Sequence, residues 1–189
     1  MSCASLILAA GAGVRYGQPK ASVILDGERL VDRAVRLSHA AGCTPVVVVL
    51  GAWIADVPDA QVVVNSDWEL GMGTSLAVGL RWLAEHCQAE AVLVNLVDLP
   101  GMTADAMSAI RCADGDVVAA TFDGERGHPV KFGRAHWLAV ADRAHGDVGA
   151  RDFLRHHRPV TLVEVGHLAI GTDLDVPAEP PMPPEALQR

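Results

Sequence analysis

The sequence predicts an α/β fold, a three-layer α/β/α sandwich with a Rossmann-like, mainly parallel sheet at its centre. Short apolar runs rich in β-branched residues recur along the chain, bounded by glycine or polar turns, which is typical of strands buried on both faces. The segments between them carry apolar residues at the helical period, and this alternation favours a parallel sheet covered on both sides. With 189 residues, 50% of them hydrophobic, the chain is long enough to bury one core. We expect a single domain over residues 1–176 and a proline-rich tail over residues 177–189.

The first half of the domain is expected to alternate strands and helices. The run VVVVL at 46–50 is apolar throughout and is closed by Gly51, as expected of a central strand. Leu30, Ala34 and Leu37 repeat with the period of a helix. The expected strands lie at 6–10, 46–50 and 62–64, and the expected helices at 30–41 and 76–86.

The second half continues the pattern and adds a hairpin. AVLVNL at 91–96 is the most apolar run and predicts a buried strand. The segment FDGERGHPVKF predicts a hairpin that turns at Asp123 and Gly124. The expected strands lie at 91–96, 116–120, 130–132 and 160–165, and helices are expected from about Thr103 and at 137–144 and 151–156.

The composition argues against several classes of partner. A formal net charge of −8 disfavours sequence-independent binding to nucleic acid or to an anionic membrane surface. No apolar run is long enough to span a bilayer, and no signal peptide is evident. The scattered cysteines form no C-x-x-C pair, which favours reduced thiols; they are Cys3, Cys43, Cys87 and Cys112. We therefore expect a cytoplasmic protein that binds neither nucleic acid nor membranes.

The stretch LILAAGAGVRYGQPKAS, residues 6–22, is the strongest functional signal in the chain. A short apolar run leads into Gly11, Gly13 and Gly17, which allow tight turns and let backbone N–H groups approach a ligand closely. Arg15 and Lys20 supply charge-assisted hydrogen bonds suited to phosphate. A strand that leads into a basic, glycine-rich loop predicts a site for a nucleoside triphosphate.

Two better-known phosphate loops do not fit this spacing. The dinucleotide motif G-x-G-x-x-G requires glycine where Tyr16 stands. The Walker motif requires lysine directly after its last glycine, whereas Gln18 and Pro19 separate Gly17 from Lys20. The alternative without a ligand is a strand-to-helix loop that uses glycine only to turn.

A second polar stretch, NSDWELGMGTS at 65–75, lies between an expected strand and an expected helix. Asn65 follows the strand, and Gly71, Thr74 and Ser75 lie near the helix start, where backbone N–H and hydroxyl groups can bind a base edge and a ribose. The alternative is an ordinary loop with a Thr or Ser helix cap.

Asp98 follows the most apolar strand. A carboxylate there is costly unless it meets solvent or a cation, and the carboxyl edge of such a sheet is where ligands collect. Asp98 is therefore expected to bind Mg²⁺. The alternative is that Asp98 caps the helix that begins near Thr103.

These stretches resemble one family. LAAGAGVRYGQPK is similar to the signature L-A-[AG]-G-x-[GS]-x-R-[MLF]-G-x-x-K, with Tyr16 as the one departure. This signature belongs to the nucleotidyltransferases that activate molybdopterin and to their relatives acting on sugar phosphates and isoprenoid precursors. The 65–80 stretch resembles the family's nucleoside-recognition segment, and LVDLP resembles the motif whose Asp98 holds the metal. The resemblance covers residues 6–179 and implies the fold of nucleotide-diphospho-sugar transferases.

The resemblance implies a set of nucleotide-binding residues, of which Arg15, Lys20 and Asp98 are expected to be catalytic. Ala10 resembles the cytidylyltransferase branch, since guanylyltransferases usually carry L-A-G-G, so CTP is favoured and GTP is the alternative. The implied set is Leu8, Ala9, Ala10, Gly11, Gly13, Arg15, Lys20, Asn65, Gly71, Thr74, Ser75 and Asp98.

Other matches imply the acceptor side and the metal. HPVKF resembles a substrate-side segment and points to His128 and Pro129. GDVGAR resembles a further segment and points to Asp147 and Arg151, with a capped helix as the alternative. DLDVPAE resembles an acidic pattern in which Asp175 joins Asp98 on the metal and Asp173 is the alternative ligand.

The resemblance therefore implies a Mg²⁺-dependent nucleotidyltransferase. It would move a nucleoside monophosphate from a nucleoside triphosphate to a phosphorylated acceptor, molybdopterin being favoured, and release pyrophosphate. A molybdenum hydroxylase would receive the product. The alternatives are another phosphorylated metabolite as acceptor, a nucleotide-binding module without turnover, and an NAD-dependent dehydrogenase, which Tyr16 disfavours.

Overall fold

The computed structural model describes residues 2–174 and builds them around one large sheet. Seven strands follow the order β5-β4-β1-β6-β8-β7-β9, and β2 and β3 form a separate hairpin. The strands are β1 Cys3–Leu8, β2 Ile24–Leu25, β3 Glu28–Arg29, β4 Val46–Leu50, β5 Gln61–Val64, β6 Ala91–Leu96, β7 Val117–Phe122, β8 Glu125–Gly133 and β9 Thr161–Glu164. The predicted metal ligand Asp175 and the predicted tail at 177–189 lie outside the described residues.

The large sheet is mainly parallel, which confirms the predicted fold class. β5, β4, β1 and β6 run parallel to one another, and β7 runs parallel to β9. Only β8, among the seven strands, is antiparallel to its neighbours β6 and β7. The predicted β7–β8 turn is confirmed at Asp123 and Gly124, both of which have positive φ, as a two-residue hairpin turn requires.

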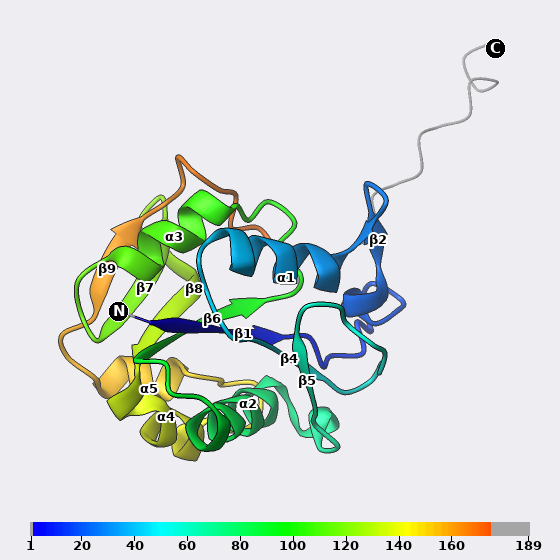
Figure 1. Cartoon of the computed structure of the whole chain (residues 1–189), viewed down its shortest axis with the longest axis horizontal. Helices are drawn as coiled ribbons and strands as arrows, with labels where there is room; N and C mark the ends of the chain where they lie inside the picture. Colours follow the sequence, from blue (N-terminus) through cyan, green and yellow to red (C-terminus); the bar gives the residue numbers. More distant parts are fainter. Residues whose placement is uncertain (1, 175–189) are drawn as a thin grey trace, which may run out of the picture.

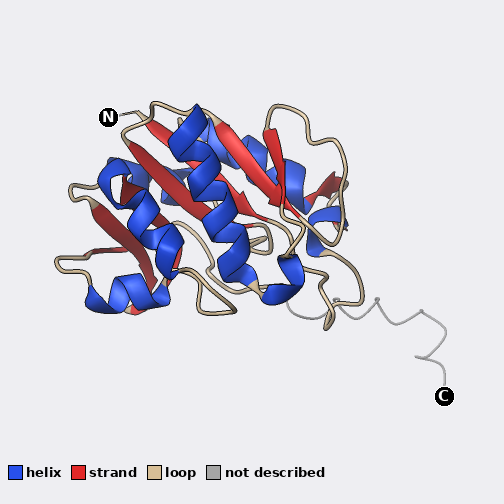
Figure 2. Ribbon diagram, turned by 90° about the horizontal axis from the view of Figure 1, so that it is seen from below, coloured by secondary structure: helices blue, strands red, loops and turns tan. Residues whose placement is uncertain are grey.

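Helices cover both faces of the sheet and complete the three layers (Figure 1). α1 (Leu30–Ala40) and α3 (Ala104–Cys112) lie on one face, and α2 (Met72–His86), α4 (Trp137–Arg143) and α5 (Arg151–His156) lie on the other. Figure 2 shows the helices of this second face lying over the sheet. Within β1, Leu6 and Leu8 pack with the α2 side while Ile7 packs with the α1 side. Burial on both faces explains why a central strand such as β4 is apolar without alternation.

Most predicted elements shift by one to three residues at an end, and two larger differences have local reasons. β1 ends at Leu8 rather than at 10, although the Ala9 N–H still donates to the Val49 carbonyl over 3.0 Å before the glycine loop begins. α2 begins at Met72 rather than at 76, since its first turn is built from glycine and hydroxyl residues that carry no helical apolar period. β8 begins at Glu125 rather than at 130, because the strand continues through the polar half of the hairpin.

Among residues 2–174 there is no helix long and apolar enough to cross a membrane. The four cysteines are free thiols, in agreement with the prediction from their spacing. Because β1, β4, β5 and β6 run parallel, their carboxyl ends meet at one edge of the sheet, where ligands of open α/β folds bind.

Candidate functional site

Two cavities lie next to each other at the carboxyl ends of β1 and β6. One, of about 460 Å³, is lined by the loop that follows β1, and we call it the glycine-loop cavity. The other, of about 650 Å³, is lined by residues of β8 and α5, and we call it the arginine cavity. The two share part of their lining: Leu8, Arg15, Lys20, Met72, Leu96 and Asp98. Three predicted catalytic residues therefore stand where the two cavities meet.

The glycine loop has a fixed shape and an open face. Gly13 has a φ of 63°, and a β-carbon there would lie 2.0 Å from the carbonyl oxygen of Gln18. The Gly17 N–H donates to the Gly13 carbonyl over 2.8 Å, so the loop folds back on itself. Gly11 is exposed, and a β-carbon at that position would meet no atom within 4 Å. Gly13 is thus required by the loop itself, while Gly11 leaves room for a ligand.

Lys20 and Asp98 form an ion pair between the two cavities. Lys20 opens the 3-10 turn Lys20–Ser22, and Asp98 follows β6. The Lys20 Nζ lies 2.7 Å from the Asp98 Oδ2, and the two side chains are only 14% and 19% exposed. The alternative role of Asp98 as a helix cap does not hold, because Thr103 caps α3 by accepting the Ala106 N–H with its hydroxyl.

The segment 168–174 is fastened to the loop after β6 and carries a second carboxylate to the site. The Leu174 N–H donates to the Asp98 carbonyl over 2.9 Å, and the Ile170 N–H donates to the Gly101 carbonyl over 3.1 Å. Asp173 thereby lines the arginine cavity together with Asp98.

These two carboxylates fit a Mg²⁺ ion that is also bound by substrate. Mg²⁺ commonly takes one or two protein carboxylates and completes its shell with phosphate oxygens and water. Residues 2–174 contain no group of three or more His, Cys, Asp or Glu side chains placed to hold a metal ion. A Mg²⁺ ion on Asp98 and Asp173 would therefore need further oxygen ligands from substrate or water.

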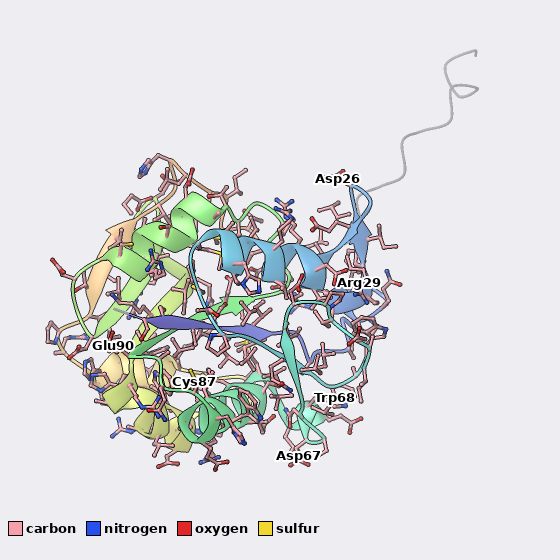
Figure 3. The ribbon with its side chains drawn as sticks, in the orientation of Figure 1. Asp26, Arg29, Asp67, Trp68, Cys87 and Glu90 are labelled. Carbon is pink, nitrogen blue, oxygen red and sulfur yellow. The ribbon has the colours of Figure 1, made fainter. Side chains whose placement is uncertain are left out.

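Asn65 organises the second polar stretch from inside the protein. Its buried side chain donates to the hydroxyls of Thr74 and Ser75 over 2.8 and 2.9 Å and accepts the Asp67 N–H over 3.0 Å. These bonds tie the end of β5 to the start of α2, in the region where Figure 3 places Asp67 and Trp68. Ser75 lines the glycine-loop cavity, whereas Asn65 and Thr74 do not appear in its lining. The geometry gives Asn65 a positioning role, and its direct contact with a base stays a prediction.

The loop at 145–149 packs against the start of α2. Gly71 has a φ of 105°, and a β-carbon there would lie 2.4 Å from the carbonyl carbon of Gly146. The Gly73 N–H donates to the Gly146 carbonyl over 2.7 Å. This packing places Asp147 beside Gly71 in the glycine-loop cavity, although the sequence pattern assigns Asp147 to the acceptor side. Its partner in that assignment, Arg151, does line the arginine cavity.

The arginine cavity combines an apolar floor with a basic wall. Arg126 and Arg155 join Arg151 in its lining, and neither was predicted. Arg126 precedes His128 by two residues on β8, so both side chains lie on the same face of the strand. Arg155 follows Arg151 by four residues on α5, so both side chains lie on the same face of the helix. The floor consists of Leu76, Val94, Ala119, Val130 and Phe132.

His128 lines the arginine cavity, and its Nδ1 lies 3.4 Å from the Val94 carbonyl. Burial holds the pKa of His128 below its usual value, and this effect outweighs the opposing influence of that carbonyl and of the Asp98 carboxylate. A neutral imidazole is therefore favoured. Pro129 is buried and is part of neither cavity lining.

Comparisons with known proteins show which family and which fold this chain resembles. The model of one family, the MobA-like NTP transferase domain, matches residues 5–160. Nicotine blue oxidoreductase of Paenarthrobacter nicotinovorans is 35% identical over 188 residues, which cover 90% of each chain. A probable molybdenum cofactor guanylyltransferase of Mycobacterium ulcerans is 31% identical over 151 residues, which cover 76% of this chain and 69% of the relative.

A solved structure shares the whole fold. The crystal structure of Rv0371c from Mycobacterium tuberculosis superposes with a TM-score of 0.79 and 25% identity, covering 93% of each chain. A second crystal structure of Rv0371c, in complex with manganese, superposes with a TM-score of 0.71 and 23% identity, covering 87% of this chain and 89% of that one.

Proposed function

The chain belongs to the family of MobA-like NTP transferases, and on that premise we propose that it transfers a nucleoside monophosphate from a nucleoside triphosphate to a phosphorylated acceptor. The observation that carries this proposal is the Lys20–Asp98 ion pair on the lining shared by the two cavities. Two substrates that fill adjacent cavities meet at their common wall. A cation and a carboxylate at that wall are the groups that phosphoryl chemistry requires.

The glycine-loop cavity is assigned to the nucleoside triphosphate. Gly11 has open space above it, so a phosphate can approach the backbone there. Lys20 and Arg15 line this cavity and neutralise charge on the α-phosphate and on the departing pyrophosphate. Ser75, held by Asn65, also lines this cavity near the start of α2, and its hydroxyl is proposed to contact the ribose.

The arginine cavity is assigned to the acceptor. Arg126 and Arg151 bring positive charge to a chain whose formal net charge is −8, so an anionic acceptor is selected locally. An oxygen of the acceptor phosphate attacks the α-phosphorus, a new P–O bond forms, and the bond from the α-phosphorus to the bridging oxygen breaks, which releases pyrophosphate. A phosphate nucleophile needs no general base, so a neutral His128 serves to orient it. Catalysis rests on position and charge.

Asp98 and Asp173 are the described carboxylates that would hold a divalent cation, and Asp175 is the further candidate that the sequence pattern favours. The ion, Mg²⁺ in this proposal, would supply positive charge to the phosphates of the bound nucleotide. This role is supported by the position of Asp98 on the lining shared by the two cavities and by the hydrogen bond that its carbonyl accepts from the Leu174 N–H.

The base is proposed to be cytosine, and guanine is the alternative. Ala10 is the residue that distinguishes the two branches by resemblance, and it lines the glycine-loop cavity. The relative from Mycobacterium ulcerans is named as a guanylyltransferase, which supports GTP instead.

The proposed acceptor is molybdopterin carrying molybdenum, and a molybdenum hydroxylase is the proposed recipient of the product. The experiment is pyrophosphate release by the purified protein with Mg²⁺ and this acceptor, with CTP, GTP, ATP and UTP offered separately. Release with CTP alone supports the cytidylyltransferase, and release with GTP alone corrects the base. Release that requires a different phosphorylated acceptor corrects the acceptor and keeps the reaction.

A second candidate function rests on one specific finding. The relative from Paenarthrobacter nicotinovorans, 35% identical over 90% of this chain, is named as an oxidoreductase. Such a reaction needs a reductant, and a reduced nicotinamide dinucleotide is the one to test, although Tyr16 departs from the dinucleotide motif. Bound in the glycine-loop cavity, it would pass a hydride to a conjugated organic acceptor in the arginine cavity, with a proton taken from solvent. Loss of nicotinamide absorbance at 340 nm, followed with nicotine blue as the acceptor, separates this reaction from pyrophosphate release, because neither signal arises from the other chemistry.

A further inference from the structure

The Asp98 carboxylate has two possible cationic partners, the Lys20 ammonium and a divalent cation, and this bears on the order in which ligands bind. We propose that Lys20 competes with divalent cations for Asp98 in the nucleotide-free protein, and that nucleotide relieves this competition by drawing Lys20 onto its phosphates. This inference rests on the proposed function for the identity of the nucleotide. It does not rest on turnover.

The competition follows from distance and burial. The Lys20 ammonium lies 2.7 Å from the Asp98 Oδ2, and both side chains are largely screened from water. A divalent cation on the same carboxylate would stand within a few ångströms of the ammonium, where like charges repel strongly in a medium of low dielectric constant. The Lys20 ammonium therefore lowers the affinity of the Asp98 carboxylate for a divalent cation.

Lys20 is the partner that can leave. Asp98 is fixed through its backbone, since its carbonyl accepts the Leu174 N–H over 2.9 Å and the preceding Val97 N–H donates to the Leu8 carbonyl over 3.2 Å. Lys20 carries its charge on a flexible four-carbon stem and lines both cavities, so it can move from Asp98 toward phosphates in the glycine-loop cavity. A triphosphate offers Lys20 a partner of higher charge than one carboxylate.

The expected behaviour is weak cation binding by the free protein and mutual strengthening of cation and nucleotide binding. Coupling between two ligands of one protein typically changes an affinity by about 5–150-fold. Part of that coupling comes from direct contact between the ion and the phosphates, so the informative measurement is made without nucleotide.

The experiment measures Mn²⁺ binding to the full chain by electron paramagnetic resonance, in which the signal of the free ion reports the unbound concentration. The proteins are the wild type, Lys20→Met, Lys20→Arg and the charge control Arg81→Met. The control removes one positive charge from an exposed ion pair between Arg81 of α2 and Asp142 of α4. Lys20→Met should bind Mn²⁺ at least about fivefold more tightly than the wild type. Lys20→Arg and Arg81→Met should bind as the wild type does. Adding Asp98→Asn to Lys20→Met should abolish the gain.

Each outcome is decisive once circular dichroism shows that the variants are folded. Unchanged or weaker Mn²⁺ binding by Lys20→Met contradicts the proposed competition. An equal gain in Mn²⁺ affinity in Arg81→Met also contradicts it, because the loss of one positive charge anywhere on the protein would then explain the gain. A gain that survives Asp98→Asn also overturns it, since the ion would then bind elsewhere. These results are independent of catalysis: a protein that releases no pyrophosphate can still show the gain, and an active transferase can lack it.

Discussion

The Lys20 ammonium lies 2.7 Å from the Asp98 carboxylate and thereby joins the glycine loop to the carboxyl end of β6. Both residues belong to the lining common to the two cavities, so both proposed substrates would contact this pair. Ion pairs of this kind add little net stability. We therefore relate the Lys20–Asp98 pair to function through its position.

Replacing Lys20 by Ala should reduce turnover by at least about a hundredfold, which is typical when a donor that stabilises charge in the transition state is removed. The measurement is the rate of pyrophosphate release at saturating nucleotide, with Lys20→Arg as the variant that keeps the charge. Wild-type turnover in Lys20→Ala would show that Lys20 has no role in catalysis.

Two glycine variants should separate the shape of the loop from its contact with a ligand. Gly11→Ala should melt at the wild-type temperature, because its β-carbon meets open space, but it should raise the KM for nucleotide. Gly13→Ala should lower the melting temperature, because its β-carbon would lie 2.0 Å from the Gln18 carbonyl oxygen in a left-handed backbone conformation. Thermal melting and initial rates measure the two effects. An unchanged KM in Gly11→Ala would contradict close approach of a ligand at this position.

Asn65→Ala should destabilise the protein by about 1–3 kcal/mol, since it removes a buried amide and leaves polar partners unpaired. It should also raise the KM for nucleotide, because Ser75 loses the bond that orients it. Urea denaturation and initial rates provide the two readouts. If Asn65 binds the base directly instead, Ser75→Ala should leave the KM unchanged while Asn65→Ala raises it.

Glu164 should make the stability depend on pH in the acid range. Its carboxylate accepts the N–H groups of Gly124, Gly166 and Asp123 and the Thr121 hydroxyl, which lowers its pKa to about 2. The unfolded-state pKa of glutamate is about 4.3. The folded value is the lower one, so this contribution is fully present above the unfolded pKa and is lost as the pH falls through the window from about 4.3 to about 2.

Glu164→Gln should therefore be less stable than the wild type at pH 7 and should lose less stability between pH 5 and pH 2.5. Urea denaturation across this range compares the two proteins. Parallel pH profiles would show that the carboxylate is not held by these bonds in solution.

Much of the fold could be predicted because its signals are local. The unbroken apolar run VVVVL identified β4, and the nearly unbroken run AVLVNL identified β6, since strands buried on both faces do not alternate. Glycines and basic residues close together identified the first loop. Asp98 was recognisable because a carboxylate directly after a buried strand needs a partner, although the sequence did not show that Lys20 is that partner.

The remaining features depend on contacts between distant segments. Asp147 lies in the glycine-loop cavity because Gly146 packs on Gly71 and Gly73, and no local pattern reports that packing. Asn65 has the position expected of a ligand-binding residue, but its hydrogen bonds are visible only once the start of α2 is placed beside it. Arg126 and Arg155 follow from strand and helical periods and could have been predicted.

The most direct test of nucleotidyl transfer follows the α-phosphorus itself. The purified protein is given Mg²⁺, molybdenum-loaded molybdopterin and CTP labelled at the α-phosphorus, with labelled GTP in a parallel reaction, and Asp98→Asn is run beside the wild type. We predict that the wild type moves the label into the acceptor product with one of the two nucleotides and that the folded Asp98→Asn variant does not. Equal label transfer by the variant would contradict the role of Asp98. Wild-type protein that transfers no label but oxidises a reduced nicotinamide dinucleotide in the presence of nicotine blue would contradict nucleotidyl transfer and support the oxidoreductase.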